Sequence, residues 1–558
     1  MSFSKSLVSF ISCGFFAMIA HTSSLQTTAY VNANIYDGTS FLPHHDAFLI
    51  DNGRFQKIGT TDAIKKAAPE KTVLVDLEGA LVMPGFIESH AHIIGVGKQK
   101  LMLDLRGLTP EQIAMLVQKQ AHIQPEKSWI EGRGWDQNLW PGQQFPHKII
   151  LSDVRNPVYL TRVDGHAAFV NDVALNLAGL NSSTKDPVGG HIVRDEQGHP
   201  SGVLIDTAME LVTQYKTKPT KKELEHYLDL GMQEAVSRGI TSLHDAGSQE
   251  DVLNLFIDYA RQKKLLLRLY ALIDGHDESL VEKYRHAGPL NMHDMLTIRG
   301  VKYFADGALG SNGALLLNDY VNKPGFKGLA LIDRATLLQR TIDNIRAGFQ
   351  VATHAIGDGA NRMVLDVYQE ALMETKATDA RLRIEHAQLI DPADHHLFKE
   401  FGIIASMQPI HCTSDMSWIQ KRIHPENLPH RAYPWASLLK AGATLAFGSD
   451  APVEDINPLL GIYAAVSRSD IQQSQTFLPE ERITLKQALA SYFQHAAFAE
   501  FAEHDKGAIK EGYLADFVIF KDNILHPTKS AFLMAQPSKT VVGGNVVFQK
   551  NNSALDME

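Results

Sequence analysis

Apolar runs of strand length alternate with helix-period stretches, such as residues 224–238 and 335–347, between about residues 84 and 507. Regular alternation of strands and helices predicts a parallel sheet. Eight of the apolar runs have the character of barrel strands, and eight such units predict an α/β fold, a distorted (β/α)8 TIM barrel. The predicted strands are 86–90, 240–244, 265–271, 299–305, 350–354, 383–386, 403–408 and 444–449.

The two ends of the chain have a different pattern. Residues 29–84 alternate apolar and polar positions and are broken by Asp-Gly, Asn-Gly and Glu-Gly, which is typical of β-hairpins. The last 50 or so residues show the same pattern. We therefore predict one small β-sandwich domain formed by residues 25–83 and 508–558, with the barrel domain, 84–507, between them. Two separate β-appendages are the alternative.

The first and second predicted barrel strands are about 150 residues apart. Such a gap is too long for a loop within a compact domain. We therefore predict an inserted subdomain at about residues 95–237.

The N-terminal stretch is typical of an export signal. Lys5 precedes an apolar run, residues 7–20, which is short for a membrane span and is followed by small residues. We predict an export signal over residues 1–24, a periplasmic or secreted protein, and no stable membrane span once the signal is removed. A retained anchor or a buried helix is the alternative. The chain has two cysteines, Cys13 and Cys412, so signal removal would leave no intramolecular disulfide.

Composition is that of a globular protein, with 44% hydrophobic and 21% charged residues. The net charge is −10 and no basic block occurs, which argues against a nucleic-acid partner. A small-molecule substrate is the expected partner. A homodimer is the general expectation for a soluble enzyme.

Side chains able to bind a metal follow the predicted strands at their carboxyl ends, where barrel enzymes place their catalytic groups. His90 and His92 are two residues apart, so on a strand they face the same side. The other candidates at strand ends are His244, Lys302, Asp306, His354, His386, Gln408 and Asp450. Imidazole and carboxylate ligands suit zinc or another borderline divalent ion.

Several longer motifs carry a family resemblance. In the barrel they are PGFIESHAH, VKYFADGALGS, THAIGDGAN, RIEHAQ and GSDAPVEDINPL; in the insertion they are GRGWDQNLW, RVDGHAAFVN and GGHIVRDEQGHPSGVLID; and GAIKEGYLADFVIF lies before the last strands. Over nearly the whole chain after the export signal, the sequence resembles the amidohydrolase superfamily. It is most similar to amidohydrolase family 3, the YtcJ-like and N-substituted formamide deformylase-like proteins. The resemblance implies a metallo-dependent hydrolase barrel.

The resemblance also implies a site with two divalent metal ions. His90, His92 and Asp450 would bind one ion, and His354 and His386 the other. Lys302 would bridge them as an N-carboxylated lysine, because an ammonium cannot bind a cation whereas a carbamate made with CO2 has two ligand oxygens. An enzyme with one metal would leave Lys302 unmodified.

The implied reaction is hydrolysis of a non-peptide C–N bond, in an N-substituted amide or formamide, by a metal-activated hydroxide. Asp450 would act as general base and then as general acid. The alternatives are a metal-dependent deaminase or another hydrolase of the superfamily, and a non-catalytic ligand-binding relative. Candidates for substrate contact are Trp135, Asp136, His166, Gln408 and Arg468. Packing is the favoured interpretation of Trp135. For Arg468, a helix-surface position is at least as good an interpretation as substrate contact.

Overall fold

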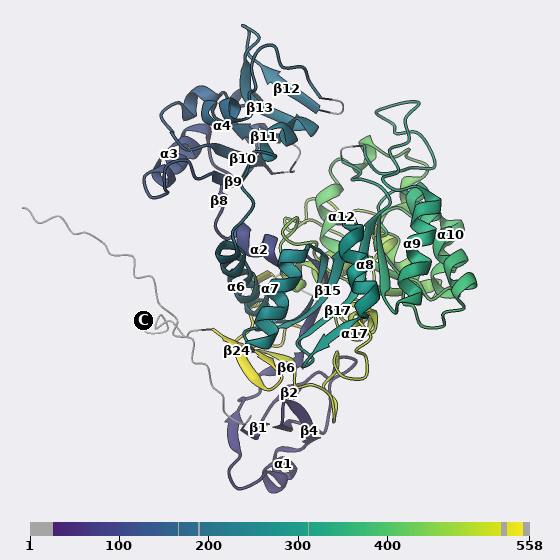
Figure 1. Ribbon diagram of the computed structural model, residues 1–558. Helices are drawn as coiled ribbons and strands as arrows, with labels where there is room; N and C mark the ends of the chain where they lie inside the picture. Colours follow the sequence, from purple (N-terminus) through teal and green to yellow (C-terminus); the bar gives the residue numbers. More distant parts are fainter. Residues whose placement is uncertain are drawn as a thin grey trace, which may run out of the picture.

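The computed structural model describes residues 26–163, 165, 167–187, 190–310, 312–525 and 533–550 (Figure 1). The predicted export signal, residues 1–24, lies outside this range. Among the helices of the described residues, none is both long and apolar enough to cross a membrane.

Eight parallel strands form the central barrel, which confirms the predicted fold class. In spatial order they are β7 (Phe86–Ala91), β14 (Ile240–Ser248), β15 (Arg268–Asp274), β17 (Leu296–Phe304), β18 (Gln350–Ala355), β19 (Arg383–His386), β20 (Ile404–Met407) and β21 (Thr444–Phe447). The first and last strands meet just beyond their regular pairing. There Asp450 donates its backbone N–H to His90 O at 2.8 Å, and His92 donates its own to Ala451 O at 2.8 Å. The barrel therefore closes at the level of the predicted metal ligands.

Helices surround the strands, as Figure 1 shows for α7 to α10. Most are amphipathic, and their apolar faces share one large core with the outer face of the barrel. The barrel helices are α6 (Lys221–Ser237), α7 (Glu250–Arg261), α8 (Glu278–Ala287), α9 (Arg334–Arg346), α10 (Asp358–Thr375), α11 (His395–Glu400), α14 (Trp435–Lys440) and α16 (Leu485–Tyr492). Further helices lie in the connections: α12 (Pro409–Asp415), α13 (Leu428–Arg431), α15 (Pro458–Ser467) and α17 (Gln494–Ala499).

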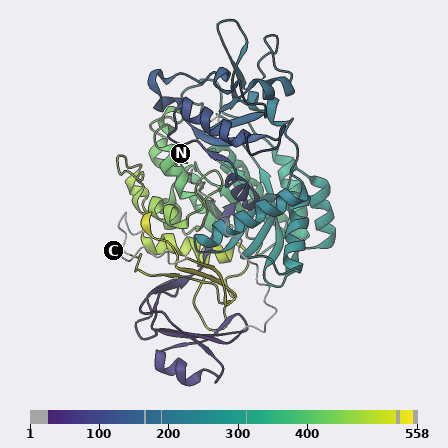
Figure 2. The ribbon, with the colours of Figure 1, turned by 90° about the vertical axis from the view of Figure 1, so that its left-hand side faces the viewer.

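Both chain ends build the small β-sandwich below the barrel (Figures 1 and 2). One sheet has the order β4 (Arg54–Gly59), β3 (Ala47–Asp51), β1 (Thr28–Val31), β5 (Val73–Asp76), with α1 (Thr61–Ala67) beside it. The other has the order β2 (Asn34–Ile35), β6 (Leu81–Pro84), β22 (Phe517–Phe520), β23 (Lys539–Val542), β24 (Asn545–Gln549). Antiparallel pairing of β6 with β22 joins the two ends of the chain. Between the sheets, Phe48 packs against Tyr30, Phe55 and Phe517.

A separate six-stranded sheet stands above the barrel mouth (Figure 1). The chain leaves the barrel through α2 (Ile93–Gln99) and returns through α6. Between them are β8 (Leu103–Asp104), α3 (Pro110–Ala121), β9 (Ile130–Trp135), β10 (Val158–Arg162), β11 (Ala167–Val170), α4 (Asp172–Leu177), β12 (Gly190–Arg194), β13 (Pro200–Asp206) and α5 (Glu210–Thr213). The sheet has its own apolar core, so these residues pack as a unit on a two-helix stem.

Candidate metal centre

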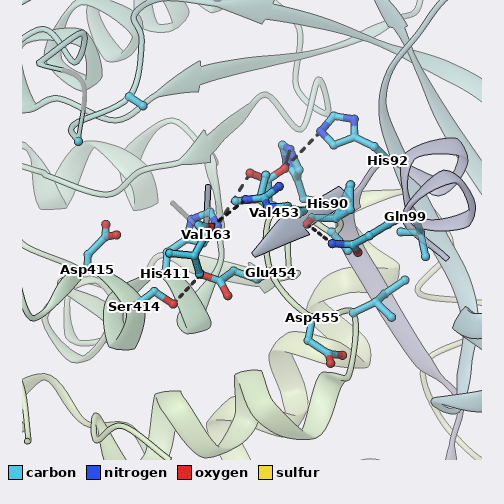
Figure 3. A pocket seen from close by; sticks show the side chains of 18 of the residues that line it. His90, His92, Gln99, Val163, His411, Ser414, Asp415, Val453, Glu454 and Asp455 are labelled. Atoms are coloured by element: carbon cyan, nitrogen blue, oxygen red, sulfur yellow. Dashed lines mark hydrogen bonds and ion pairs between the residues drawn. The ribbon is translucent and has the colours of Figure 1, made fainter. Parts of the chain in front are cut away.

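A cavity of about 1340 Å³ opens at the carboxyl ends of the barrel strands, and Figure 3 shows part of its lining. Barrel loops form one side and the inserted subdomain contributes residues such as Arg133 and Val163 to the other. All the side chains expected to bind metal line this cavity: His90, His92, Lys302, His354, His386 and Asp450. Six residues that are up to 360 positions apart thus come from five strand ends to one place.

His90, His386 and Asp450 form the tightest group. One potential ligand atom from each lies within 4.8 Å of the others. Asp450 Oδ1 is 3.5 Å from His90 Nε2 and 3.2 Å from His92 Nε2. The rings of His354 and His386 are 4.4 Å apart between centroids. The geometry therefore gathers imidazole nitrogens around one carboxylate, as a divalent-ion site requires.

Unpartnered nitrogen atoms support the same conclusion. Nε2 of His90 and Nε2 of His354 are buried, and neither makes a hydrogen bond within the described part of the chain. A buried polar atom without a partner is costly, and native proteins rarely leave one without a reason. A borderline divalent ion such as zinc would accept these lone pairs, so the residues present fit a metal.

For His90 and His386, neighbouring side chains determine which ring nitrogen is available to a metal. The Nδ1 atom of His90 lies 2.5 Å from a carboxylate oxygen of Glu385, and the Nδ1 atom of His386 lies 2.8 Å from Gln408 Oε1. Both partners are acceptors, so each Nδ1 carries the proton and donates it. Nε2 is then left as a lone pair directed at the site, which is how metal-binding histidines are usually oriented.

Below the ligands, Arg383 crosses the barrel interior. Its guanidinium donates to Glu385 Oε1 at 2.7 Å, to Ser89 O at 2.7 Å and to Ser406 Oγ at 2.9 Å. Burial opposes ionisation of Glu385, yet Arg383 and His90 hold the pKa of its carboxyl well below the usual range. The carboxylate facing His90 is therefore charged. His244 pairs with Arg383 at 2.9 Å, so it belongs to this buried network and does not line the cavity.

The electrostatics favour an ionised Asp450, while burial disfavours the charged forms of His354 and Lys302. Burial alone would raise the pKa of Asp450, but the hydrogen bond from His92 and the nearby His90 and His386 hold it well below its usual range. Burial, reinforced by Lys302, lowers the pKa of His354 to about 3. Burial also lowers the pKa of Lys302, whose Nζ lies 4.3 Å from the Phe304 ring centroid.

Two of the ligand residues have strained backbones. His386 has φ = 71° and Asp450 has φ = 58°, in the left-handed region that residues with a side chain seldom adopt. Such strain persists only where the surrounding structure enforces it, and it is often found at functional sites. Here it lies directly at the ends of β19 and β21, where the chain turns at the cavity floor.

The described residues that were predicted to contact the substrate do not line the cavity. Trp135 is fully buried in the core of the inserted subdomain, where its indole N–H donates to Leu160 O at 2.8 Å. Asp136 pairs with Arg162 at 3.1 Å; of the two, Arg162 lines the cavity. Gln408 is buried behind His386, and His166 lies outside the described residues.

Arg468 has a structural environment. It is fully buried on the Trp435 ring, 4.4 Å from the ring centroid, and donates to Phe477 O at 2.6 Å and Tyr433 O at 2.9 Å. From the sequence alone, an arginine close to predicted site residues can be mistaken for one that binds the substrate. The structure instead places Trp135 and Arg468 in packed cores, away from the cavity lining, which corrects the expectation of substrate contact for both.

Residues that the resemblance did not assign as metal ligands also shape the site. His411, on α12, lines the cavity with a buried Nε2 that lies 3.9 Å from Asp450 Oδ2 (Figure 3). Glu385 precedes His386 and could have been noticed as a charged residue two positions from Arg383 in a buried strand. Asp306 accepts backbone N–H groups from the loops at Leu315, Ile356 and Gly357, so it braces the cavity wall.

The comparisons with known proteins agree with this geometry. The model of the family described as "Amidohydrolase family" matches residues 73–548. Protein LONG AFTER FAR-RED 3 of Arabidopsis thaliana is 37% identical over 93% of this chain and 91% of its own. YtcJ of Bacillus subtilis is 31% identical over 91% of this chain and 96% of its own. The N-substituted formamide deformylase of Arthrobacter pascens is 24% identical over 94% and 98%.

A solved structure has the same fold. The crystal structure of an uncharacterised metal-dependent hydrolase from Pyrococcus horikoshii OT3 superposes with a TM-score of 0.76 at 27% identity. The match covers 90% of this chain and 99% of that one.

Proposed function

Because this chain belongs to the amidohydrolase family, we propose that it hydrolyses a non-peptide C–N bond, in an N-substituted amide or formamide. The observation that carries the proposal is the group of His90, His386 and Asp450, whose ligand atoms lie within 4.8 Å of one another on the floor of a large cavity. Likeness to an N-substituted formamide deformylase supports the substrate class.

Two divalent ions, zinc in our proposal, would be held by the residues gathered there. His90, His92 and Asp450 would hold one ion, and His354 and His386 the other. Lys302 would bridge them after its amine adds CO2 and loses a proton, which turns the amine into a carbamate anion with two ligand oxygens. Such ions supply an activated water and polarise the scissile carbonyl.

Asp450 would carry the proton. Its low pKa keeps the carboxylate ionised at neutral pH, so it can accept a proton from the attacking water. As the C–N bond breaks, the same carboxyl group returns that proton to the leaving nitrogen. Glu385 and Gln408 contribute by holding the His90 and His386 rings, so that both Nε2 atoms stay directed at the site.

Metal content tests the site. Protein purified without chelator should contain two equivalents of metal per chain, and Lys302→Ala should retain one or none, because the bridging ligand is lost. Undiminished metal in Lys302→Ala would exclude a bridging role for this lysine.

Turnover tests the reaction. A panel of N-formyl and N-acyl amines should be hydrolysed by the wild type, and Asp450→Asn should be slower by about 10² to 10⁴, the usual effect of losing an acid–base group. Asp62→Asn, an exposed position in α1, is the matched control and should keep full activity. Ammonia released from aminated rings instead would identify a deaminase. Tight metal binding with no turnover of either class would favour a non-catalytic relative.

A further inference from the structure

The cavity contains a cationic side chain that the proposed reaction does not use. Arg422 lies in the connection from β20 to β21 and lines the cavity. Within the described part of the chain, its side-chain hydrogen bonds are to one carbonyl oxygen, Gly310 O, from Nε at 3.3 Å and from Nη2 at 3.0 Å. Across the described residues, no carboxylate lies within ion-pair distance of this guanidinium. A guanidinium has five N–H donors, so most of them have no partner among the described residues.

Most other cations of the cavity wall are neutralised by neighbours. Arg106 pairs with Asp104, and Arg162 with Asp136 at 3.1 Å. Lys100 and Arg238 share Glu234, at 2.6 and 3.0 Å. These pairs belong to the outer part of the cavity, on the inserted subdomain and its stem.

Arg133 also has no carboxylate partner among the residues that the structure describes, but its position differs. It is on β9 of the inserted subdomain, and its guanidinium donates a 3.5 Å hydrogen bond to Val163 O. Arg422 is instead on a barrel loop that follows β20, and its partner Gly310 is on the loop that follows β17, the strand of Lys302. Of the two cations, Arg422 is the one carried by a barrel loop.

The position of Arg422 is fixed by two loops. Its backbone carbonyl accepts the N–H of Val321 at 3.0 Å, and its own N–H donates to Ile419 O at 2.9 Å. Trp418, one helical turn earlier, also lines the cavity. The guanidinium is therefore held ready for a ligand, which reduces the entropy lost on binding.

Asp415 does not neutralise Arg422. Asp415 lines the cavity on the same connection, but its carboxyl group accepts hydrogen bonds from Gln388 at 2.9 Å and Tyr433 at 2.5 Å. Burial raises the pKa of Asp415 to about 6. The carboxyl group of Asp415 is thus engaged by neutral donors, and no carboxylate of the described residues pairs with Arg422.

We propose that the substrate is an amide that carries a carboxylate, and that Arg422 binds this carboxylate through its planar, two-pronged guanidinium. The inference rests on the proposed hydrolysis and specifies the substrate class. Arg422 acts as a specificity residue: it holds the part of the substrate remote from the scissile bond.

A matched pair of substrates tests this: N-formylphenylalanine and N-formylphenethylamine differ only in the carboxylate. The wild type should have a kcat/KM for the acid about 10- to 100-fold above that for the neutral amide, as expected for one charged hydrogen-bonded contact. Arg422→Gln should remove that preference, chiefly through KM, and leave the neutral amide unchanged. Arg334→Gln, which removes an exposed guanidinium on α9, is the control.

Equal losses on both substrates in Arg422→Gln would mean that Arg422 only holds the two loops together, and would overturn the proposal. A wild type that prefers the neutral amide would also overturn it. If Arg422→Gln fails to fold, Arg422→Lys serves, because it retains the charge without the two-pronged geometry. Its preference for the acid should lie between those of the wild type and a neutral side chain.

If neither amide is hydrolysed, the proposed function fails, and binding then decides the inference. Calorimetric titration with 3-phenylpropionate, which has no scissile bond, should show at least about tenfold weaker binding to Arg422→Gln than to the wild type. Equal affinities would refute the assignment of Arg422 as the carboxylate site.

Discussion

Glu385 shows how much a single residue at this site depends on its buried neighbours. Its side chain is almost fully buried, and its carboxylate lies between the Arg383 guanidinium and His90 Nδ1. The charge is tolerated there because both partners are close and hydrogen-bonded. The same carboxylate fixes the His90 ring, so one residue both neutralises a buried cation and orients a candidate metal ligand.

We therefore expect Glu385→Gln to weaken metal binding by about 10- to 100-fold, the usual effect of losing the partner of a ligand histidine. Arg383 would also lose its counter-ion in a buried place, which should lower the free energy of unfolding by about 3–5 kcal/mol. Metal titration and urea unfolding measure the two effects. Glu196→Gln, at an exposed turn, is the control. Wild-type metal affinity in Glu385→Gln would show that His90 is oriented by other contacts.

Residue types at strand ends made the group of candidate metal ligands predictable, whereas the residues that orient these ligands were not predictable. His90 and His386 follow apolar runs and are recognisable one at a time. Glu385 and His90 are 295 positions apart, and nothing in either local sequence indicates the pairing. Trp135 and Arg468 show the converse, because aromatic and cationic residues near a motif look the same whether they line a cavity or fill a core.

The presence of each barrel strand was easier to predict than its first and last residues. All eight predicted runs overlap barrel strands, because a buried strand needs a continuous apolar segment. The third run was predicted at 265–271, but β15 begins at Arg268. Leu265 and Leu267 are buried in the barrel core before the strand pairing begins, and apolarity alone cannot show where hydrogen bonding starts.

Arg268 connects the barrel to the β-sandwich. It donates to Asp516 Oδ2 at 2.7 Å and to Oδ1 at 2.8 Å, and both side chains are about 95% buried. Asp516 directly precedes β22, so the pair links an inner barrel strand to the sheet that contains both chain ends.

Removing one partner, as in Arg268→Met or Asp516→Asn, should lower the free energy of unfolding by about 3–5 kcal/mol, because the other group remains buried without compensation. The double variant should lose less than the sum of the two, since neither charge is then left alone. Urea unfolding of the four proteins in the cycle gives the coupling energy. Strictly additive losses would show that Arg268 and Asp516 stabilise the protein independently of each other.

At the scale of the whole molecule, the metal site and the inserted subdomain share a stem. His92 is followed by α2, which crosses α6 where each helix has a glycine. A Cβ on Gly97 would overlap the carbonyl of Tyr227, and a Cβ on Gly231 would overlap the carbonyl of Ile93. Ile93 is also held by Asp245 of β14, whose carboxylate accepts its N–H at 2.8 Å. The close crossing thus sets how the subdomain leaves the barrel directly beside the ligands.

Gly231→Ala tests this crossing, because two effects of the substitution predict opposite changes in the free energy of unfolding. In an isolated helix alanine would stabilise by about 1 kcal/mol over glycine. In the crossing, the added methyl meets backbone atoms that cannot rotate away, so we expect a net loss of about 1–3 kcal/mol in urea unfolding. Turnover should fall as well, because separation of α2 from α6 displaces Ile93, the neighbour of His92. Gly59→Ala, where the new Cβ would meet only side-chain atoms at 3.7 Å or more, should change neither quantity. A stabilised and fully active Gly231→Ala would show that the stem can widen freely and that the site does not depend on the position of the subdomain.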